Sequence, residues 1–391
     1  MFFSWNSSKR PPYSSFSKLK KLSFYSSDSP LLEVNYNLKK RMRLLKRICA
    51  SPKLESLNIN TMTLDAASCL QRYRKLKFLH LGCSFPEFVS AKELEIPGVE
   101  YSINFHNGDS RTIINFDVKK KHNLILNNTR SIDLAYRPEQ VPTPVLPLIC
   151  LYANQFQKLT SLTCEFFLDR FTQFPDLNAL RKLKALDSIC FKLEVGRDTS
   201  PTLFDKLVLP ERIREFRLNF LKSGNLDLKN ALNSQAFFIG LEKLKSLELF
   251  ELTMCDSIYG ITYESNDKKK KYYSYFIKRC LARLTTSLKH LSVEAPISKE
   301  PDENLFKLVY TFKNLESLDL NLNTSVSKEI MSHRTKQYQK IKKLRLYDSL
   351  SFLMGLTNSS FEQIENLSLL VLEPNGDITI IDLLDKILLM K

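Results

Sequence analysis

The sequence has few of the features on which most enzymes and membrane proteins depend. Its 391 residues contain no run of 18 or more apolar residues, which argues against a membrane-spanning helix. Only nine glycines occur, and no glycine-rich phosphate loop or Gly-x-Ser-x-Gly elbow is present. The five histidines have no acidic or cysteine partner at a diagnostic spacing. We therefore expect no enzyme, no cofactor and no small-molecule substrate.

Cysteine usage also excludes several classes of protein. The eight cysteines are scattered, with no Cys-x-x-Cys pair and no Cys/His cluster at zinc spacing. The N-terminus lacks the apolar segment of a secretory signal. These observations predict reduced, mostly buried thiols in an intracellular, cytoplasmic or nuclear protein without a metal site, and a mitochondrial location stays open.

One short phrase recurs along the chain, most clearly at 315–320 (LESLDL). Its apolar residues stand at positions 1, 4 and 6, and positions 4 and 6 have the spacing of a strand with one buried face. A weaker copy begins at Thr129, and another lies within 99–105, where the sequence leaves the register open. Further clear copies begin at Leu54, Leu76, Leu159, Leu186, Ile213, Leu244, Leu288, Ile341 and Ile364.

The spacing of the phrase indicates a repeat architecture. Neighbouring clear copies begin 22 to 31 residues apart, except for gaps of 83 and 44 residues. A period of about 20–29 residues with one strand per unit is typical of leucine-rich repeats, and residues 51–391 resemble that family. The family's usual Asn or Cys at position 9 occurs only as Asn323, so the resemblance is to the irregular ribonuclease-inhibitor and F-box groups.

The resemblance implies an α/β solenoid of about 11–12 repeats. Its curved parallel sheet would line the concave side, and its helices would lie on the convex side. The 44-residue gap predicts one repeat plus an insertion near 256–284. Residues 378–390 are predicted to form a C-terminal capping helix or to dock a partner.

The first fifty residues carry much of the positive charge. They hold eleven Lys or Arg against two acids, a surplus of nine out of the chain's +16. Residues 1–30 are predicted to be a flexible, basic, Ser-rich leader, and a disordered tail, a mitochondrial transit peptide and a nucleic-acid arm remain open. Residues 31–50 are predicted to be an N-terminal capping helix that shields the first strand, with a degenerate F-box-like helix as the alternative.

Two basic clusters are candidate contacts for an anionic partner such as RNA. The second cluster directly precedes several aromatic residues, and basic side chains beside aromatics can hold phosphates and stack bases. A solvated lysine loop leading into a helix with buried aromatics explains that cluster equally well. The clusters are Lys39, Lys40, Arg41 and Arg43, and Lys268, Lys269, Lys270 and Lys271.

The inner face of the predicted sheet is the main candidate site. Positions 3, 5 and 7 of the phrase flank the buried positions, so their side chains should face solvent on the concave side. These columns hold six acids and four bases, whereas a nucleic-acid groove needs clustered Lys and Arg. The face therefore suits a protein or peptide ligand. The candidate contacts are Arg217, Glu248, Phe250, Asp319, Arg345 and Tyr347.

Together these patterns predict a non-enzymatic leucine-rich repeat protein that recognises or scaffolds another protein through its concave face. Two alternatives remain. One is an F-box-like substrate adaptor of a ubiquitin ligase, and the other is a subunit of an RNA-containing assembly.

Overall fold

The computed structural model describes residues 20–24, 53–59, 75–83, 98–105, 128–134, 149, 153–168, 177–195, 209–222, 235–254, 267–295, 305, 308–309, 311–321, 340–347 and 363–370. The strands in these residues are β1 (Lys21–Phe24), β2 (Ser56–Ile59), β3 (Phe78–Cys83), β4 (Glu100–Phe105), β5 (Thr129–Leu134), β6 (Ser161–Leu168), β7 (Ser188–Val195), β8 (Glu215–Lys222), β9 (Leu249–Met254), β10 (His290–Glu294), β11 (Ser317–Asn321), β12 (Lys343–Tyr347) and β13 (Asn366–Leu370). The helices are the 3₁₀ helix η4 (Leu177–Lys182) and the α-helices α7 (Gln235–Glu242) and α8 (Asp267–Leu281).

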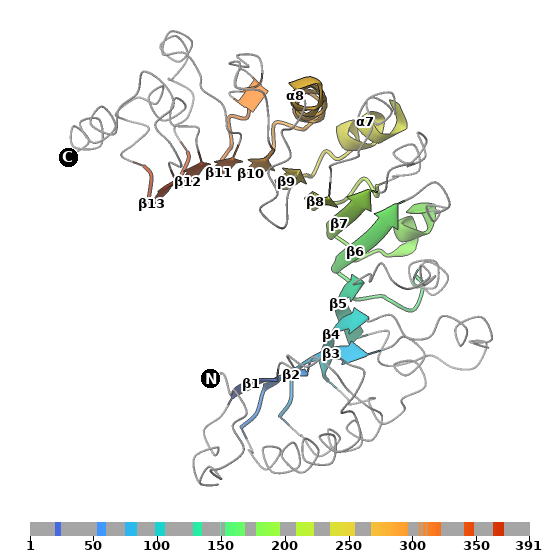
Figure 1. Cartoon of the computed structure of the whole chain (residues 1–391). Coiled ribbons are helices and arrows are strands. Elements are labelled where there is room, and N and C mark those ends of the chain that lie inside the picture. Colours follow the sequence, from blue (N-terminus) through green and yellow to red (C-terminus); the bar gives the residue numbers. More distant parts are fainter. Residues whose placement is uncertain are drawn as a thin grey trace, which may run out of the picture. The chain divides into compact units, whose positions relative to one another are not determined.

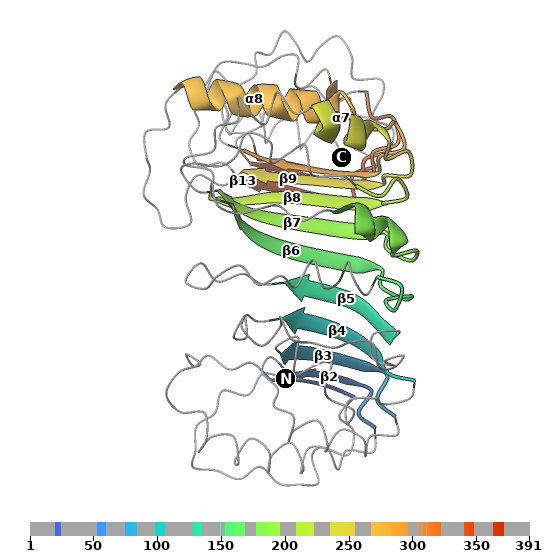
Figure 2. The same ribbon diagram turned by 90° about the vertical axis from the view of Figure 1, so that its right-hand side faces the viewer.

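The chain divides into two compact units, 1–164 with 182–186, and 165–181 with 187–391. In the first unit β1 to β5 pair in the order of the sequence, and β5 pairs with β6. In the second unit β7 to β13 also pair in order. Every one of these pairings is parallel, as the sequence predicts (Figures 1 and 2). The open parallel sheet of an α/β protein is therefore present in both units.

The apolar positions of the phrase build the core. In the clearest copy Leu315, Leu318 and Leu320 are all at most 1% exposed, whereas the residues between the last two positions and beyond them are half-buried. Because successive side chains of a strand point to opposite faces, each strand presents one apolar face and one polar face. We call the polar one the open face.

Helices α7 and α8 cover the apolar face of the second unit, and Figure 1 shows both on the same side of its strands. The Phe276 ring of α8 lies 6.1 Å from Phe237 of α7 in a stacked arrangement and 6.3 Å from Phe220 of β8 in an edge arrangement. Arg279 of α8 lies 4.1 Å above the Phe238 ring. These aromatic contacts join both helices to the sheet and leave the open face to the polar side chains.

The structure settles the register that the sequence left open within 99–105, and it shows which element fills part of the 44-residue gap. Within 99–105 the register is fixed by the pairing of Tyr101 and Ile103 with Leu79 and Leu81, which makes them positions 4 and 6 of the phrase. Both are at most 1% exposed, and so is Val99, which stands one residue after position 1. Gly98 precedes it with a φ of 80°, a conformation that glycine adopts without strain. The 44-residue gap is a single long repeat, since β9 pairs directly with β10 and α8 lies between them. The predicted insertion near 256–284 is therefore partly this covering helix, with 255–266 outside the described residues.

The prediction that residues 1–30 form a flexible leader is wrong at Lys21–Phe24, which form β1 and pair with β2. The sequence signal was weak because β1 has only four residues and a basic flank. The predicted capping segment 31–50 consequently lies between β1 and β2 and not before the first strand, although its own structure is outside the described residues. The C-terminal segment 378–390 also lies outside them.

Candidate functional site

The open face of the second unit places one candidate residue, Arg217 of β8, among acids and a hydroxyl group. Its Nη1 lies 3.0 Å from Glu215 Oε2, and its Nε lies 3.3 Å from Glu251 Oε2 on β9. The same Nη1 donates to Ser188 Oγ of β7 at 3.3 Å. The Arg217 side chain is 30% exposed, so its charge is held in place across three strands while part of it still meets solvent.

A second charged group lies farther along the same face. Arg345 Nη1 of β12 lies 3.4 Å from Asp319 Oδ2 of β11, and Asn321 Nδ2 donates to Glu294 Oε1 of β10 at 3.0 Å. Burial raises the pKa of Asp319, and the negative charges of Glu294 and Glu251 raise it further, while Arg345 opposes them. Among the described residues, Asp319 therefore lies in a partly buried position where neighbouring negative charges oppose its ion pair with Arg345.

Three of the six candidate contacts lie on the open face, namely Arg217, Asp319 and Arg345. They share one cross-strand row, because the registers pair Arg217 with Glu251 and Asp319 with Arg345. The backbone of Tyr347 pairs with Asn321, two residues farther along this face, and its side chain lies outside the described residues.

The predicted place of Phe250 on the open face is wrong, because the side chain is fully buried. The pairing of Phe216 with Phe250 puts Phe250 at position 4 of the phrase, three residues later than the copy at Leu244 predicts, so Leu249 is half-buried on the open face. Leu249 and Phe250 are adjacent and both apolar, and the larger aromatic ring takes the core position, 6.1 Å from the Phe216 ring. The phrase at Leu244 therefore does not predict Glu251 on the open face, whereas the alternation of apolar residues at 250, 252 and 254 would predict it.

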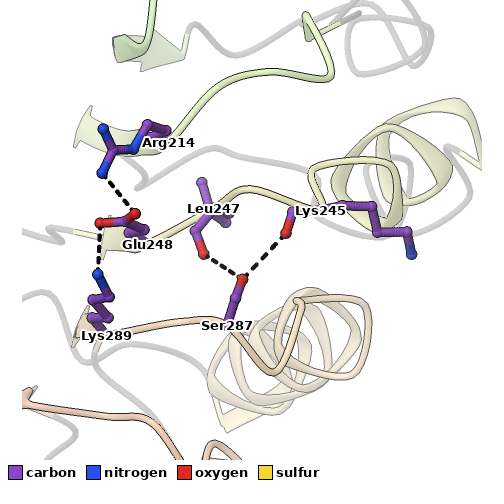
Figure 3. A network of polar contacts seen from close by, with 6 residues as sticks. All are labelled: Arg214, Lys245, Leu247, Glu248, Ser287 and Lys289. Atoms are coloured by element: carbon purple, nitrogen blue, oxygen red, sulfur yellow. Dashed lines mark hydrogen bonds and ion pairs between the residues drawn. The ribbon is translucent and has the colours of Figure 1, made fainter.

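Glu248 was predicted to lie on the inner face of the strand, but it immediately precedes β9 and is not part of that strand. Its carboxylate binds Arg214 at 2.7 Å and Lys289 at 3.2 Å, each of which immediately precedes a neighbouring strand (Figure 3). The Arg214 hydrogen bond, aided by Lys289, lowers the pKa of Glu248 although burial opposes the change. In the same network, Ser287 Oγ donates to the carbonyl groups of Lys245 and Leu247 at 3.2 and 3.1 Å.

Glu248 is one member of a column that we call the strand-start column, the residues immediately before each strand. From Asp187 before β7 to Glu365 before β13, the carbonyl of each member accepts the backbone N–H of the next member and that of the residue after it. The same holds for Lys20 and Glu55 in the first unit. Glu248 O, for example, accepts Lys289 N at 2.8 Å and His290 N at 2.9 Å, and Lys289 O accepts Glu316 N at 2.7 Å and Ser317 N at 2.9 Å. Backbone hydrogen bonds thus connect neighbouring strands along this margin of the sheet.

The strand-start column is also a ladder of alternating charge. In the second unit its members are Asp187, Arg214, Glu248, Lys289, Glu316, Lys342 and Glu365. Acid and base alternate without exception, and ion pairs join Arg214 to Glu248, Glu248 to Lys289 and Lys342 to Glu365. The first unit begins in the same way, with Glu55 between Lys20 at 3.9 Å and Lys77 at 3.2 Å. Neighbouring repeats therefore meet with opposite charges along this margin of the sheet.

The open face of the first unit carries a chain of hydrogen-bonded hydroxyl and imidazole groups. His80 Nδ1 lies 2.8 Å from Ser102 Oγ, and Ser131 Oγ donates to Ser102 Oγ at 2.7 Å. These side chains come from the consecutive strands β3, β4 and β5. A surface of hydroxyl and imidazole groups can both donate and accept hydrogen bonds, which fits contact with polar backbone or side-chain groups.

The remaining chemistry of the described residues is sparse. They contain no group of three or more potential metal ligands, and no helix among them is long and apolar enough to cross a membrane. Cys164, Cys190 and Cys280 are buried, and burial raises the pKa of the Cys280 thiol. Of the anionic-partner candidates, Lys268–Lys271 form the start of α8, while 39–43 lie outside the described residues.

No protein-family model matches the chain, and a search of curated proteins finds no match.

Proposed function

We propose that this chain is a non-enzymatic leucine-rich repeat protein that binds another protein through the open face of its parallel sheet. The repeated phrase, the repeat-by-repeat parallel pairing and the covering helices support a solenoid in which the open face is the concave side. Proteins of this architecture offer an extended sheet surface on which several strands contribute contacts at once.

The observation that carries the proposal is the arrangement of charge on the open face of β8 to β12. Arg217 and Arg345 are partly exposed, at 30% and 56%, and each is anchored by a carboxylate of a neighbouring strand. An anchored arginine loses little side-chain entropy on binding and still offers free donors, which is why arginine is enriched at the energetic centres of protein interfaces. The half-buried acids around them add complementary positions for basic groups of the partner.

The first experiment identifies the partner. The C-terminally tagged full-length protein is purified at moderate salt, half of the sample is treated with nuclease, and the copurifying proteins are identified by mass spectrometry. A defined protein set that survives nuclease supports the proposal, and a Skp1-like member would redirect it to a ubiquitin-ligase adaptor. Loss of all partners with nuclease would contradict it and favour an RNA-containing assembly held by the basic segments.

The second experiment tests the face itself with the partner so identified. Arg217→Glu combined with Arg345→Glu should weaken binding about tenfold or more, because both changes place repulsive charge on the contact surface. The matched control is Lys245→Glu with Lys313→Glu, which makes the same change in charge at exposed sites outside the open face. Equal affinities of the two double variants would reject the open face as the binding surface.

A further inference from the structure

The charge ladder of the strand-start column ends with opposite signs at the two outer strands. At β13 the last member is Glu365, whose side chain is 63% exposed and lies 3.9 Å from Lys342. At β1 the first member is Lys20, whose side chain is 69% exposed and lies 3.9 Å from Glu55. Glu248 in the interior binds a cation on both sides, whereas Lys20 and Glu365 each have an oppositely charged partner on one side only among the described residues.

The β13 end also has apolar positions that are incompletely covered. Ile364 and Leu367 are half-buried, whereas Ile341 and Leu344, which occupy the same positions one repeat earlier, are 1% exposed. No described strand pairs with the outer edge of β13 or with that of β1. An outer strand that keeps unpaired backbone groups beside partly exposed apolar side chains is a template for another strand.

From this complementarity we propose that β13 of one molecule pairs in parallel with β1 of a second copy and so continues the ladder. Following the rule of the internal repeats, the N–H groups of Lys20 and Lys21 donate to the Glu365 carbonyl. This register pairs Lys21 with Asn366, Leu22 with Leu367, Ser23 with Ser368 and Phe24 with Leu369. Apolar positions then meet apolar positions, and Lys20 meets the Glu365 carboxylate.

The contact joins two different surfaces, so it is heterologous. Each bound copy exposes a fresh β1 or β13 edge, and association continues until a ring closes or a filament grows. Opposite charge at the contact both favours this register and disfavours β1 with β1 or β13 with β13, where like charges would meet. The interaction uses the edges of the sheet and does not depend on the open face that binds the proposed partner.

Sedimentation velocity of the full chain over a concentration series, at low and at high salt, tests the proposal. Wild type should form head-to-tail oligomers whose population rises with concentration and falls with salt. Glu365→Lys and Lys20→Glu should each weaken self-association about tenfold, because an exposed attraction becomes a repulsion of similar size. The matched controls Glu211→Lys and Lys313→Glu, at exposed positions away from both edges, should associate as wild type does.

Mixing the two edge variants makes the test decisive. Each variant alone brings like charges together at the contact, whereas an equimolar mixture restores opposite charges wherever a Glu365→Lys molecule meets a Lys20→Glu molecule. The mixture should therefore recover oligomers that neither variant forms, which a folding defect in either one would not produce. A wild-type protein that stays monomeric, or a mixture that does not exceed its components, would overturn the proposal and favour edges covered by the chain's own segments.

Discussion

Replacement of Phe250 by alanine is the sharpest test of the register of the second unit. The side chain is fully buried, with its ring centre 6.1 Å from that of Phe216, and Phe216 lies 6.0 Å from Phe191 on the next strand. Removing a buried phenylalanine costs about 3–5 kcal/mol of unfolding free energy, because apolar contacts are lost and a cavity remains. We expect Phe250→Ala to fall in this range.

The adjacent Leu249 provides the matched control. It is half-buried on the open face, so Leu249→Ala should cost only about 0.5–1 kcal/mol. The repeated phrase by itself assigns the opposite roles, with Leu249 in the core and Phe250 in solvent. The two variants therefore separate the two registers by a difference of at least about 2 kcal/mol.

Urea unfolding of the full chain, followed by far-UV circular dichroism, measures both costs. Since the chain has two compact units, the comparison applies to whichever transition Phe250→Ala shifts. A larger loss of stability in Leu249→Ala than in Phe250→Ala would refute the register and with it the place of Glu251 on the open face.

Three further predictions concern charge and thiol chemistry. Glu248→Lys places a third cation beside Arg214 and Lys289. It should lower the unfolding free energy, measured by urea unfolding, by about 1–2 kcal/mol at low salt and by less at high salt. A loss of stability that does not depend on salt would contradict the electrostatic interpretation. The raised pKa of Asp319 means that its ionised form costs stability above that pKa and that the cost disappears as the pH falls below the unfolded value. Asp319→Asn should thus be more stable than wild type near neutral pH and equal to it in acid, and a less stable variant at neutral pH would show that its ion pair outweighs burial. Burial and a raised thiol pKa should keep Cys280 unreactive towards a thiol reagent in the folded protein, whereas rapid labelling of Cys280, located by peptide mass spectrometry, would contradict its buried position.

The sequence predicted much of the fold because its signal is repeated. A single apolar triplet would be ambiguous, but many copies at a regular spacing indicate parallel strands that stack in chain order, and the described strands pair in that order. The prediction failed at β1, where four residues beside a basic segment carry too little of the pattern. It also failed at Phe250. The adjacent residues Leu249 and Phe250 are both apolar, so the phrase can be aligned with either of them in the core.

The candidate site was predictable only in part, because the repeated pattern gives the face of each residue but not its partners. Alternation along a strand placed Arg217, Asp319 and Arg345 on the open face, since that follows from strand geometry. It did not reveal which side chains pair across strands, because a partner such as Glu251 for Arg217 lies a whole repeat away in the sequence and depends on the register.

By itself the sequence determined the repeated strand, the parallel order and the sign of each charge in the strand-start column. Only the tertiary structure decided that these charges alternate between neighbours in space, because the repeats differ in length and the column appears only after the strands are brought into register. It also decided which of two adjacent apolar residues enters the core, since packing against Phe216 favours the ring of Phe250 over Leu249. The local apolar pattern of the sequence thus determines where strands form, and close packing between neighbouring strands determines their register.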